Sequence, residues 1–211
     1  MLKKPIFGII GGAGPMASLS LAKKLICLCQ KSGLWKTSDF PALRLINYPF
    51  SEMINADLNP HKLREELDQC LLELEKTCNY IVIACNTLHL FLPERPLPKL
   101  IHLIQPIKGQ IPEGTIPLIL ATQTSAQANL HGRLLDLPCE YWNPEQSENT
   151  INAILRGECP DLEWIDELAK TRLVILGCTE YSLALENATP HVNVIDPLQL
   201  AAQSLFMHHQ R

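Results

Sequence analysis

Two stretches of the chain share one pattern, and this pattern decides the fold. Tyr80–Thr87 reads Tyr-Ile-Val-Ile-Ala-Cys-Asn-Thr, and Leu173–Glu180 reads Leu-Val-Ile-Leu-Gly-Cys-Thr-Glu. Each begins with an apolar run typical of a strand buried on both faces. A small residue, a cysteine and a polar pair that can open a helix follow. The repeat predicts two related halves, each with a cysteine directly after a parallel strand.

The rest of the chain alternates short apolar strands with amphipathic helices, which is the order typical of α/β folds. Strands are expected at 5–10, 42–47, 80–84, 101–104, 116–121, 139–142, 173–176 and 192–195. Helices are expected at 16–32, 60–77, 125–135, within 145–170, at 180–187 and from 197 onward. We therefore predict an α/β protein of two similar, doubly wound domains with mainly parallel sheets, related by a pseudo-twofold axis.

A proline-rich stretch, 93–98, predicts the crossing between the domains. Open α/β sheets bind ligands at the carboxyl ends of their strands. Cys85 and Cys178 both follow such an end. If the two halves face each other, both thiols meet in one active-site cleft between the domains.

Two opposed thiols suit the inversion of an α-carbon, because one removes a proton from one face while the other delivers a proton to the opposite face. A free thiol titrates near ~8.5, and a helix N-terminus lowers that value. Asn86, Thr87 and Thr179 offer hydrogen bonds to an amino acid, and the backbone N–H groups of the turns can hold its carboxylate. Glu180 either orients the ammonium group or acts on Cys178.

The other six cysteines lack this setting and are expected to be structural: Cys27, Cys29, Cys70, Cys78, Cys139 and Cys159. The cysteines form no CxxC pair and have no histidine at zinc-finger spacing, so we expect no metal site. The N-terminal apolar run is too short for an export signal. Reduced thiols and a cytoplasmic location are therefore expected.

Composition narrows the choice of partners. Hydrophobic residues make up 46% of the chain and charged residues 19%, and the formal net charge is −4. These values are typical of a globular protein. Without a basic stripe, nucleic acid and membrane surfaces are not expected partners. No apolar run approaches the roughly 18 residues that span a bilayer.

Two motifs have competing interpretations. Gly12–Ala17 formally matches a dinucleotide fingerprint, but no acidic residue follows the strand at 42–47, and Pro15 lacks an N–H for a pyrophosphate. We prefer a glycine loop that lets substrate approach the backbone closely. His89 lies four residues after Cys85 and is either a catalytic partner of the thiol or, as we prefer, a packing or capping group.

At these motifs the sequence resembles the aspartate/glutamate racemase family, part of the wider aspartate/glutamate/hydantoin racemase group. The first match is the glycine loop Gly8–Ser18. The two cysteine turns, Ala84–His89 and Leu176–Glu180, are more specific, and Leu120–Thr124 is a weaker fourth match. The motifs span almost the whole chain in the order found in the family.

The resemblance implies two α/β domains, one of 1–98 with a returning helix in 197–211 and one of 99–196. It implies racemisation without pyridoxal phosphate or a metal, and a homodimer. It also implies Cys85 and Cys178 as the two bases, and a substrate lined by Asn86, Thr87, Thr122 and Thr179 with Met16 nearby. Gly12 and Glu180 complete the predicted substrate site.

The sequence departs from the family where some members hold a distal carboxylate with an Arg and a Lys. Residues 47–53 contain no Arg, and no Lys follows Gly157 before Lys170. Aspartate or glutamate is the expected substrate, and a neutral amino acid stays open. Two alternatives also stay open: a hydantoin racemase or maleate isomerase type of reaction, and a non-catalytic amino-acid-binding protein on the same scaffold.

Overall fold

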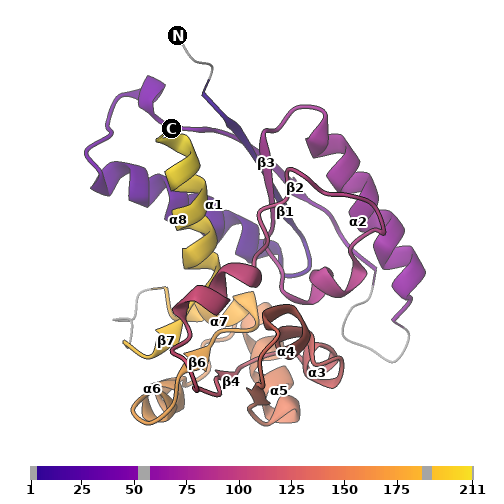
Figure 1. Cartoon of the computed structure of the whole chain (residues 1–211), viewed down its shortest axis with the longest axis vertical. Helices are drawn as coiled ribbons and strands as arrows, with labels where there is room; N and C mark the ends of the chain where they lie inside the picture. The colour runs from indigo at the N-terminus through magenta and orange to yellow at the C-terminus, as the bar shows by residue number, and fades with distance from the viewer. Residues whose placement is uncertain (1–3, 52–57, 187–191, 211) are drawn as a thin grey trace. The chain divides into compact units, whose positions relative to one another are not determined.

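The computed structural model describes residues 4–51, 58–186 and 192–210 (Figure 1). The chain divides into two compact units. Unit 1 comprises 1–103 and 198–211, and unit 2 comprises 104–197. Each is described below by itself. No helix in the described ranges combines the length and apolar character needed to span a bilayer.

Unit 1 is built on a three-stranded parallel sheet. The central strand, β1 (Ile6–Gly11), lies between β2 (Ala42–Asn47) and β3 (Tyr80–Ile83). The apolar run of β3 forms a strand because its side chains are buried on both faces of the sheet. Leu100 extends the same edge through a single parallel bridge to Ile81.

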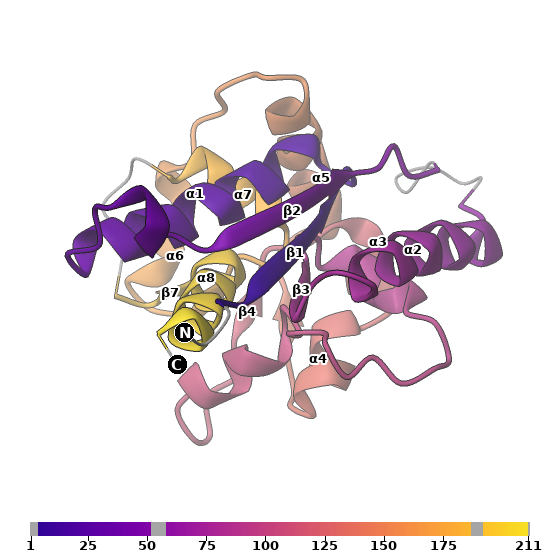
Figure 2. The same cartoon turned by 90° about the horizontal axis from the view of Figure 1, so that it is seen from above.

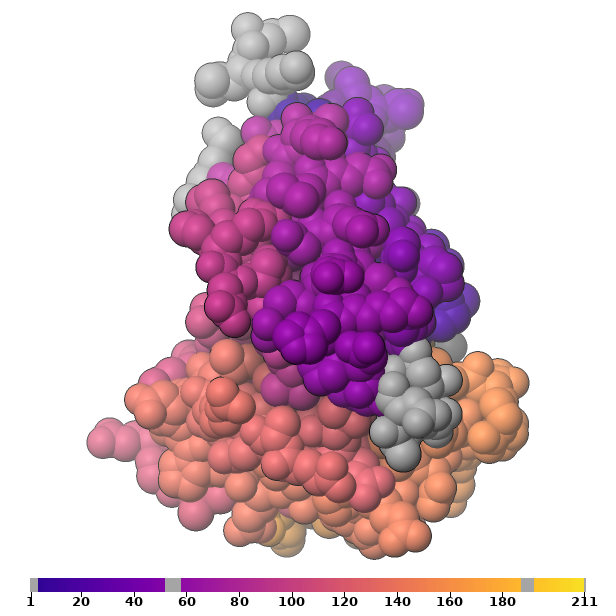
Figure 3. Space-filling view, turned by 90° about the vertical axis from the view of Figure 1, so that its right-hand side faces the viewer, coloured from indigo at the N-terminus to yellow at the C-terminus, as the bar shows by residue number. Residues whose placement is uncertain are grey.

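Helices cover both faces of this sheet, which makes the unit doubly wound (Figure 2). Helices α1 (Pro15–Lys31) and α8 (Pro197–His209) share one core with Phe7 and Ile9 of β1. Helix α2 (Pro60–Glu75) packs a row of buried leucines on the other face, and its outer side lies at the surface in Figure 3. Two short 3-10 helices complete the unit, η1 (Thr37–Asp39) and η2 (Thr87–Phe91).

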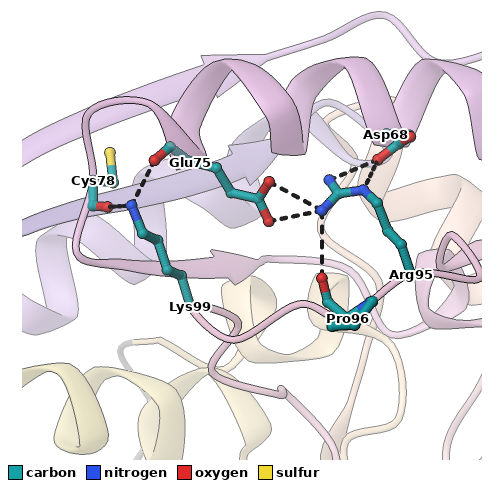
Figure 4. A network of polar contacts seen from close by, with 6 residues as sticks. All are labelled: Asp68, Glu75, Cys78, Arg95, Pro96 and Lys99. Carbon is teal, nitrogen blue, oxygen red and sulfur yellow. Dashed lines mark hydrogen bonds and ion pairs between the residues drawn. The ribbon is translucent and has the colours of Figure 1, made fainter.

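Two cations fasten the proline-rich stretch to α2 (Figure 4). The guanidinium of Arg95 lies 2.7 Å from the carboxylate of Asp68 and 3.0 Å from that of Glu75. The ammonium of Lys99 donates to the backbone oxygens of Glu75 (2.5 Å) and Cys78 (2.8 Å). Glu75 is the last residue of α2 and Cys78 lies just beyond it, so Lys99 satisfies one acceptor that the helix leaves open and one in the turn that follows.

Unit 2 repeats the design with shorter strands. Its parallel sheet has the order β5 (Glu140–Tyr141), β4 (Leu118–Ile119), β6 (Val174–Ile175) and β7 (Val194–Ile195). The order matches unit 1 strand for strand, with β4 in the place of β1 and β6 in the place of β3. The bridge at Leu100 stands where unit 2 has β7. The predicted α/β class with mainly parallel sheets is confirmed.

Helices of unit 2 follow its strands as in unit 1. They are η3 (Gln105–Gln110), α3 (Gln123–Gln127), α4 (Leu130–Leu135), α5 (Pro144–Leu155), α6 (Glu163–Ala169) and α7 (Thr179–Ala184). The core of the unit gathers buried side chains from β6, α5, α6 and α7, among them Val174, Ile151, Ile165 and Tyr181.

Two expectations from the sequence are wrong. Residues 101–104 form no strand, because the chain pairs with Ile81 only around Leu100. Leu103 is instead buried in the core with α1 and α8. The helix expected over 125–135 is split by Asn129, whose φ of 46° places it in the left-handed region that asparagine tolerates.

Some predicted positions lie outside the described residues. These are Glu52 and Met53 of the stretch 47–53, Asn187 at the end of the helix expected at 180–187, and Arg211 at the end of the closing helix.

Candidate active site

The first cysteine turn follows β3 in unit 1. The N–H of Ala84 still donates to the carbonyl of Ile10 (2.8 Å), so Cys85 is the first residue beyond the sheet. Cys85 is 6% exposed and Asn86 1%. Both amide atoms of Asn86 are buried without a hydrogen-bond partner in the described part of the chain. The NH₂ group of this amide can donate hydrogen bonds to a ligand, and its oxygen can accept them.

His89 holds the backbone of this turn. Its Nδ1 lies 2.9 Å from the carbonyl oxygen of Cys85, and the N–H of Leu103 lies 3.5 Å from its Nε2. A carbonyl only accepts, so Nδ1 carries the hydrogen and Nε2 is the acceptor. The preferred interpretation of His89 as a packing group fits these contacts, because both ring nitrogens face the backbone.

The second cysteine turn follows β6 in unit 2, and here the thiol has a carboxyl partner. The Sγ of Cys178 donates to Oε2 of Glu180 over 2.9 Å, and the hydroxyl of Thr179 donates to the same oxygen over 3.2 Å. The other oxygen of Glu180 is buried without a hydrogen-bond partner among the described residues. Burial raises the pKa of the Glu180 carboxyl, and the hydrogen bond from Cys178 opposes that shift.

A buried histidine lies beneath this turn. A Cβ placed on Gly177 would come within 2.5 Å of Ile119 and 2.9 Å of the ring of His131. Only glycine therefore fits before Cys178, whereas the equivalent residue before Cys85 is Ala84. Burial lowers the pKa of His131 to about 3, so the ring is neutral at physiological pH. The sequence pattern gave no signal for His131.

Helix α7 is anchored by polar contacts that the sequence pattern also did not reveal. The hydroxyl of Tyr181 lies 3.0 Å from that of Ser147 on α5. The hydroxyl of Ser182 donates to Asp196 over 2.7 Å. Because both anchors follow Cys178 closely, they fix the direction in which α7 leaves the turn. Such contacts join distant segments, so only the fold reveals them.

The glycine loop packs against the segment after β2. Gly12 has a φ of 114°, and a Cβ there would lie 1.8 Å from the carbonyl oxygen of Tyr48. The glycine is therefore needed for close contact between two backbone segments. Met16, one residue into α1, is 56% exposed.

Thr122 occupies the equivalent turn of unit 2. Its hydroxyl accepts from the N–H of Ser125 (3.2 Å) and donates to the Ser125 hydroxyl (3.1 Å), so it caps α3. The next N–H, of Gln123, donates to Glu148 over 2.7 Å.

The predicted site residues thus fall into two groups. In unit 1, Gly12 and Met16 follow β1, while Cys85, Asn86 and Thr87 follow β3, at the same carboxyl edge of one parallel sheet. In unit 2, Thr122 follows β4, and Cys178, Thr179 and Glu180 follow β6 at the matching edge. Among the described residues, no cluster of three or more His, Cys, Asp or Glu side chains could hold a metal ion.

No protein-family model matches the chain. Several solved structures, however, align with almost the whole chain. An aspartate racemase homologue from Pyrococcus horikoshii OT3 aligns with a TM-score of 0.71 and 24% identity, over 99% of this chain and 100% of that one. The aspartate racemase of Picrophilus torridus aligns with a TM-score of 0.73 and 18% identity, over 98% and 94%.

Glutamate racemases are also similar. The enzyme of Francisella tularensis, solved in complex with D-glutamate, aligns with a TM-score of 0.66 and 17% identity, over 97% of this chain and 80% of that one. The alignments cover both units in each case. The chain therefore has the two-domain α/β fold of the aspartate and glutamate racemases.

Proposed function

We propose that this protein racemises an amino acid by a two-base mechanism, with Cys85 and Cys178 on opposite faces of the α-carbon. The observation that carries the proposal is the equivalence of the two turns. Each cysteine follows the corresponding strand of a sheet with the same strand order. A fold duplicated in this way supplies two like groups, and racemisation needs two like groups with opposite directions of approach.

The proposed reaction balances with one proton on the pair of thiols. A thiolate on one side takes the α-proton, so the Cα–H bond breaks, an S–H bond forms, and the electron pair moves into the carboxylate as an enediolate. The opposite thiol then gives its proton to the other face of the carbon. The thiol and thiolate exchange roles, and no external oxidant or reductant takes part.

The neighbouring groups suit a substrate with an α-carboxylate. The unpaired amide of Asn86 can donate to a carboxylate oxygen, and the backbone N–H groups of the turns can do the same. Donors aimed at these oxygens also stabilise the charge that builds up in the enediolate. In the proposal, Thr87, Thr122 and Thr179 line the substrate, with Gly12 and Met16 close by.

The decisive experiment is α-proton exchange. Purified protein is incubated in deuterated water with each common amino acid in both enantiomers, without added cofactor, and exchange is followed by NMR. We expect exchange with at least one amino acid, and aspartate and glutamate are the first candidates. Cys85→Ser and Cys178→Ser should each reduce racemisation at least ~100-fold, because a serine hydroxyl is a far weaker acid than a thiol. Cys139→Ser, which changes a cysteine at the amino end of β5 and not in a turn after a strand, is the matched control.

Full activity in both serine variants would contradict the proposal. Exchange with a hydantoin, or isomerisation of maleate, but not with any amino acid would favour the related isomerase reactions instead. Thermal stabilisation by an amino acid without exchange would favour a binding protein.

Two further expectations belong to the proposal. Thiol catalysis requires reduced cysteines, which favours a reducing compartment such as the cytoplasm. We also propose a homodimer, and sedimentation velocity of the full chain tests this directly.

A further inference from the structure

The two cysteine turns differ at one position. The second residue after Cys178 is Glu180, whereas the second residue after Cys85 is Thr87. Both thiols are buried to the same degree, at 6% and 7% exposure. The two turns therefore hold equivalent places after β3 and β6 but differ in charge at the second residue after the cysteine.

Glu180 contacts the sulfur directly. Its Oε2 accepts from Sγ of Cys178 over 2.9 Å and from the hydroxyl of Thr179 over 3.2 Å. Its Oε1 has no hydrogen-bond partner among the described residues, and the side chain is 3% exposed. One oxygen of this buried carboxyl contacts the sulfur, and the other has no partner among the described residues. The Cys178 sulfur is therefore the main group with which the carboxyl can share a proton.

We propose that Glu180 keeps the exchangeable proton of the resting protein on the Cys178 side, so that Cys178 is the resting acid and Cys85 the resting base. This inference rests on the proposed racemisation and specifies its starting state. Removing the proton from the Cys178–Glu180 pair would leave two negative charges within hydrogen-bond distance in a buried site. Removing it from Cys85 brings no such repulsion from the equivalent position, because Thr87 is uncharged.

Four other titratable groups, on α7 and on the segments around it, are either neutral or hydrogen-bonded to a group other than the Cys178 sulfur. Burial raises the pKa of Tyr181 on α7 and lowers that of His131 on α4, so both are neutral at physiological pH. Glu148 on α5 accepts from the N–H of Gln123. Asp196, after β7, accepts from Ser182.

The test measures the acidity of each thiol without requiring turnover. The full-length protein is treated with iodoacetamide from pH 6 to pH 10, and alkylation of each cysteine is followed by peptide mass spectrometry. Only the thiolate reacts, so each pH–rate profile reports one thiol. We expect the midpoint for Cys85 to lie below that for Cys178 by at least about one pH unit.

Substitution of the carboxyl separates its charge from its shape. Glu180→Gln should lower the midpoint of Cys178 by about one pH unit and leave Cys85 unchanged. Glu180→Asp retains the charge at a greater distance and should give an intermediate midpoint. The control is Glu167→Gln, which removes the same charge from the exposed partner of Lys170 in the same unit and should move neither midpoint. Circular dichroism confirms that each variant is folded.

Equal midpoints for Cys85 and Cys178 in the unmodified protein would overturn the inference. An unchanged midpoint for Cys178 in folded Glu180→Gln would do the same. If the midpoints behave as expected but no amino acid exchanges its α-proton, the proton assignment holds and the proposed function fails.

Turnover offers a second readout. Racemisation has an equilibrium constant of one, so the ratio of kcat values for the two enantiomers must equal the ratio of their KM values. We expect the ratio of the two kcat values to differ from one in the unmodified enzyme. In Glu180→Gln the ratio should move at least about threefold towards one, because the two thiols become alike.

Discussion

His131 shows what a single buried residue does to the pH dependence of the molecule. Both ring nitrogens are buried without hydrogen-bond partners in the described ranges, and the ring packs against Gly177 beside the second cysteine turn. The folded-state pKa, about 3, lies below the ordinary value of 6.5. The unfolded chain therefore binds a proton that the folded chain excludes. Above pH 6.5 the ring is neutral in both states, and His131 does not lower the free energy of unfolding. As the pH drops from 6.5 towards 3, protonation of the unfolded chain lowers the free energy of unfolding progressively.

We predict that His131→Leu removes much of this acid sensitivity. Between pH 7 and pH 4, the free energy of unfolding of the unmodified protein should fall by roughly 3 kcal/mol because of this residue. Urea unfolding at both pH values measures the difference between the two proteins. The variant should be no less stable at pH 7, since leucine leaves no unpaired polar atom in the site. His102, whose pKa burial lowers to about 4, should cause a remaining decline in both proteins. Parallel decline of both proteins would contradict the assignment to His131.

At the scale of elements, the turn between β1 and α1 depends on one close approach. Gly12 and Gly33 both have positive φ, at 114° and 89°, but only Gly12 lies against another backbone segment. A Cβ on Gly12 would lie 1.8 Å from the oxygen of Tyr48, while one on Gly33 would meet no atom within 4 Å. Substitutions at these two glycines therefore distinguish the cost of backbone strain from the cost of steric overlap.

We predict that Gly33→Ala destabilises the protein by about 1–2 kcal/mol through strain alone. Gly12→Ala should cost at least about 2 kcal/mol more, because the segment after β2 has to move away. Urea midpoints of the two variants give the comparison. Equal losses of stability in the two variants would mean that the Tyr48 segment moves away at no cost in free energy. Gly12 would then be needed only for its positive φ.

The sequence predicted the elements best where local pattern and tertiary environment agree. The apolar runs before Cys85 and Cys178 became β3 and β6 because buried parallel strands need such runs. The strand expected at 101–104 failed because its apolar residues enter a helix-covered core instead of a sheet. The break at Asn129 depends on one residue in the left-handed region, which periodicity does not register.

In the candidate site, too, the sequence predicted the local motifs but not the contacts between distant segments. The two cysteine turns repeat a local motif, so they stand out in the sequence. The hydrogen bond from Cys178 to Glu180 also joins residues that are close in the sequence, but its length and the burial of both side chains follow from the fold. His131 on α4 lies against Gly177 of the second turn, and Ser147 on α5 contacts Tyr181 of α7; no local pattern indicates such contacts between distant segments.

At the scale of the whole molecule, one unit is inserted into the sequence of the other. Unit 2 occupies 104–197, and α8 then returns to unit 1. There Leu198 and Leu205 are fully buried, in one core with Leu21 and Leu25 of α1. The second crossing of the chain therefore completes the core of the first unit.

We predict that Leu205→Ala weakens unit 1 selectively, at a cost of about 2–5 kcal/mol. Hydrogen exchange followed by mass spectrometry should show faster exchange in β1 and α1, while β4 and β6 keep their protection. Val174→Ala, in the core of unit 2, is the reciprocal control and should reverse the pattern. Equal loss of protection in both units would show that they unfold as one.

The late return of α8 also sets the order of events on the ribosome. Every residue of unit 2 is synthesised before α8 emerges, which takes roughly ten seconds at ordinary rates of translation. During that interval, α1 and one face of its sheet lack the helix that covers them. The nascent protein therefore displays an unfinished apolar face to chaperones and to other nascent chains, and its vulnerability to aggregation ends only when the final helix docks.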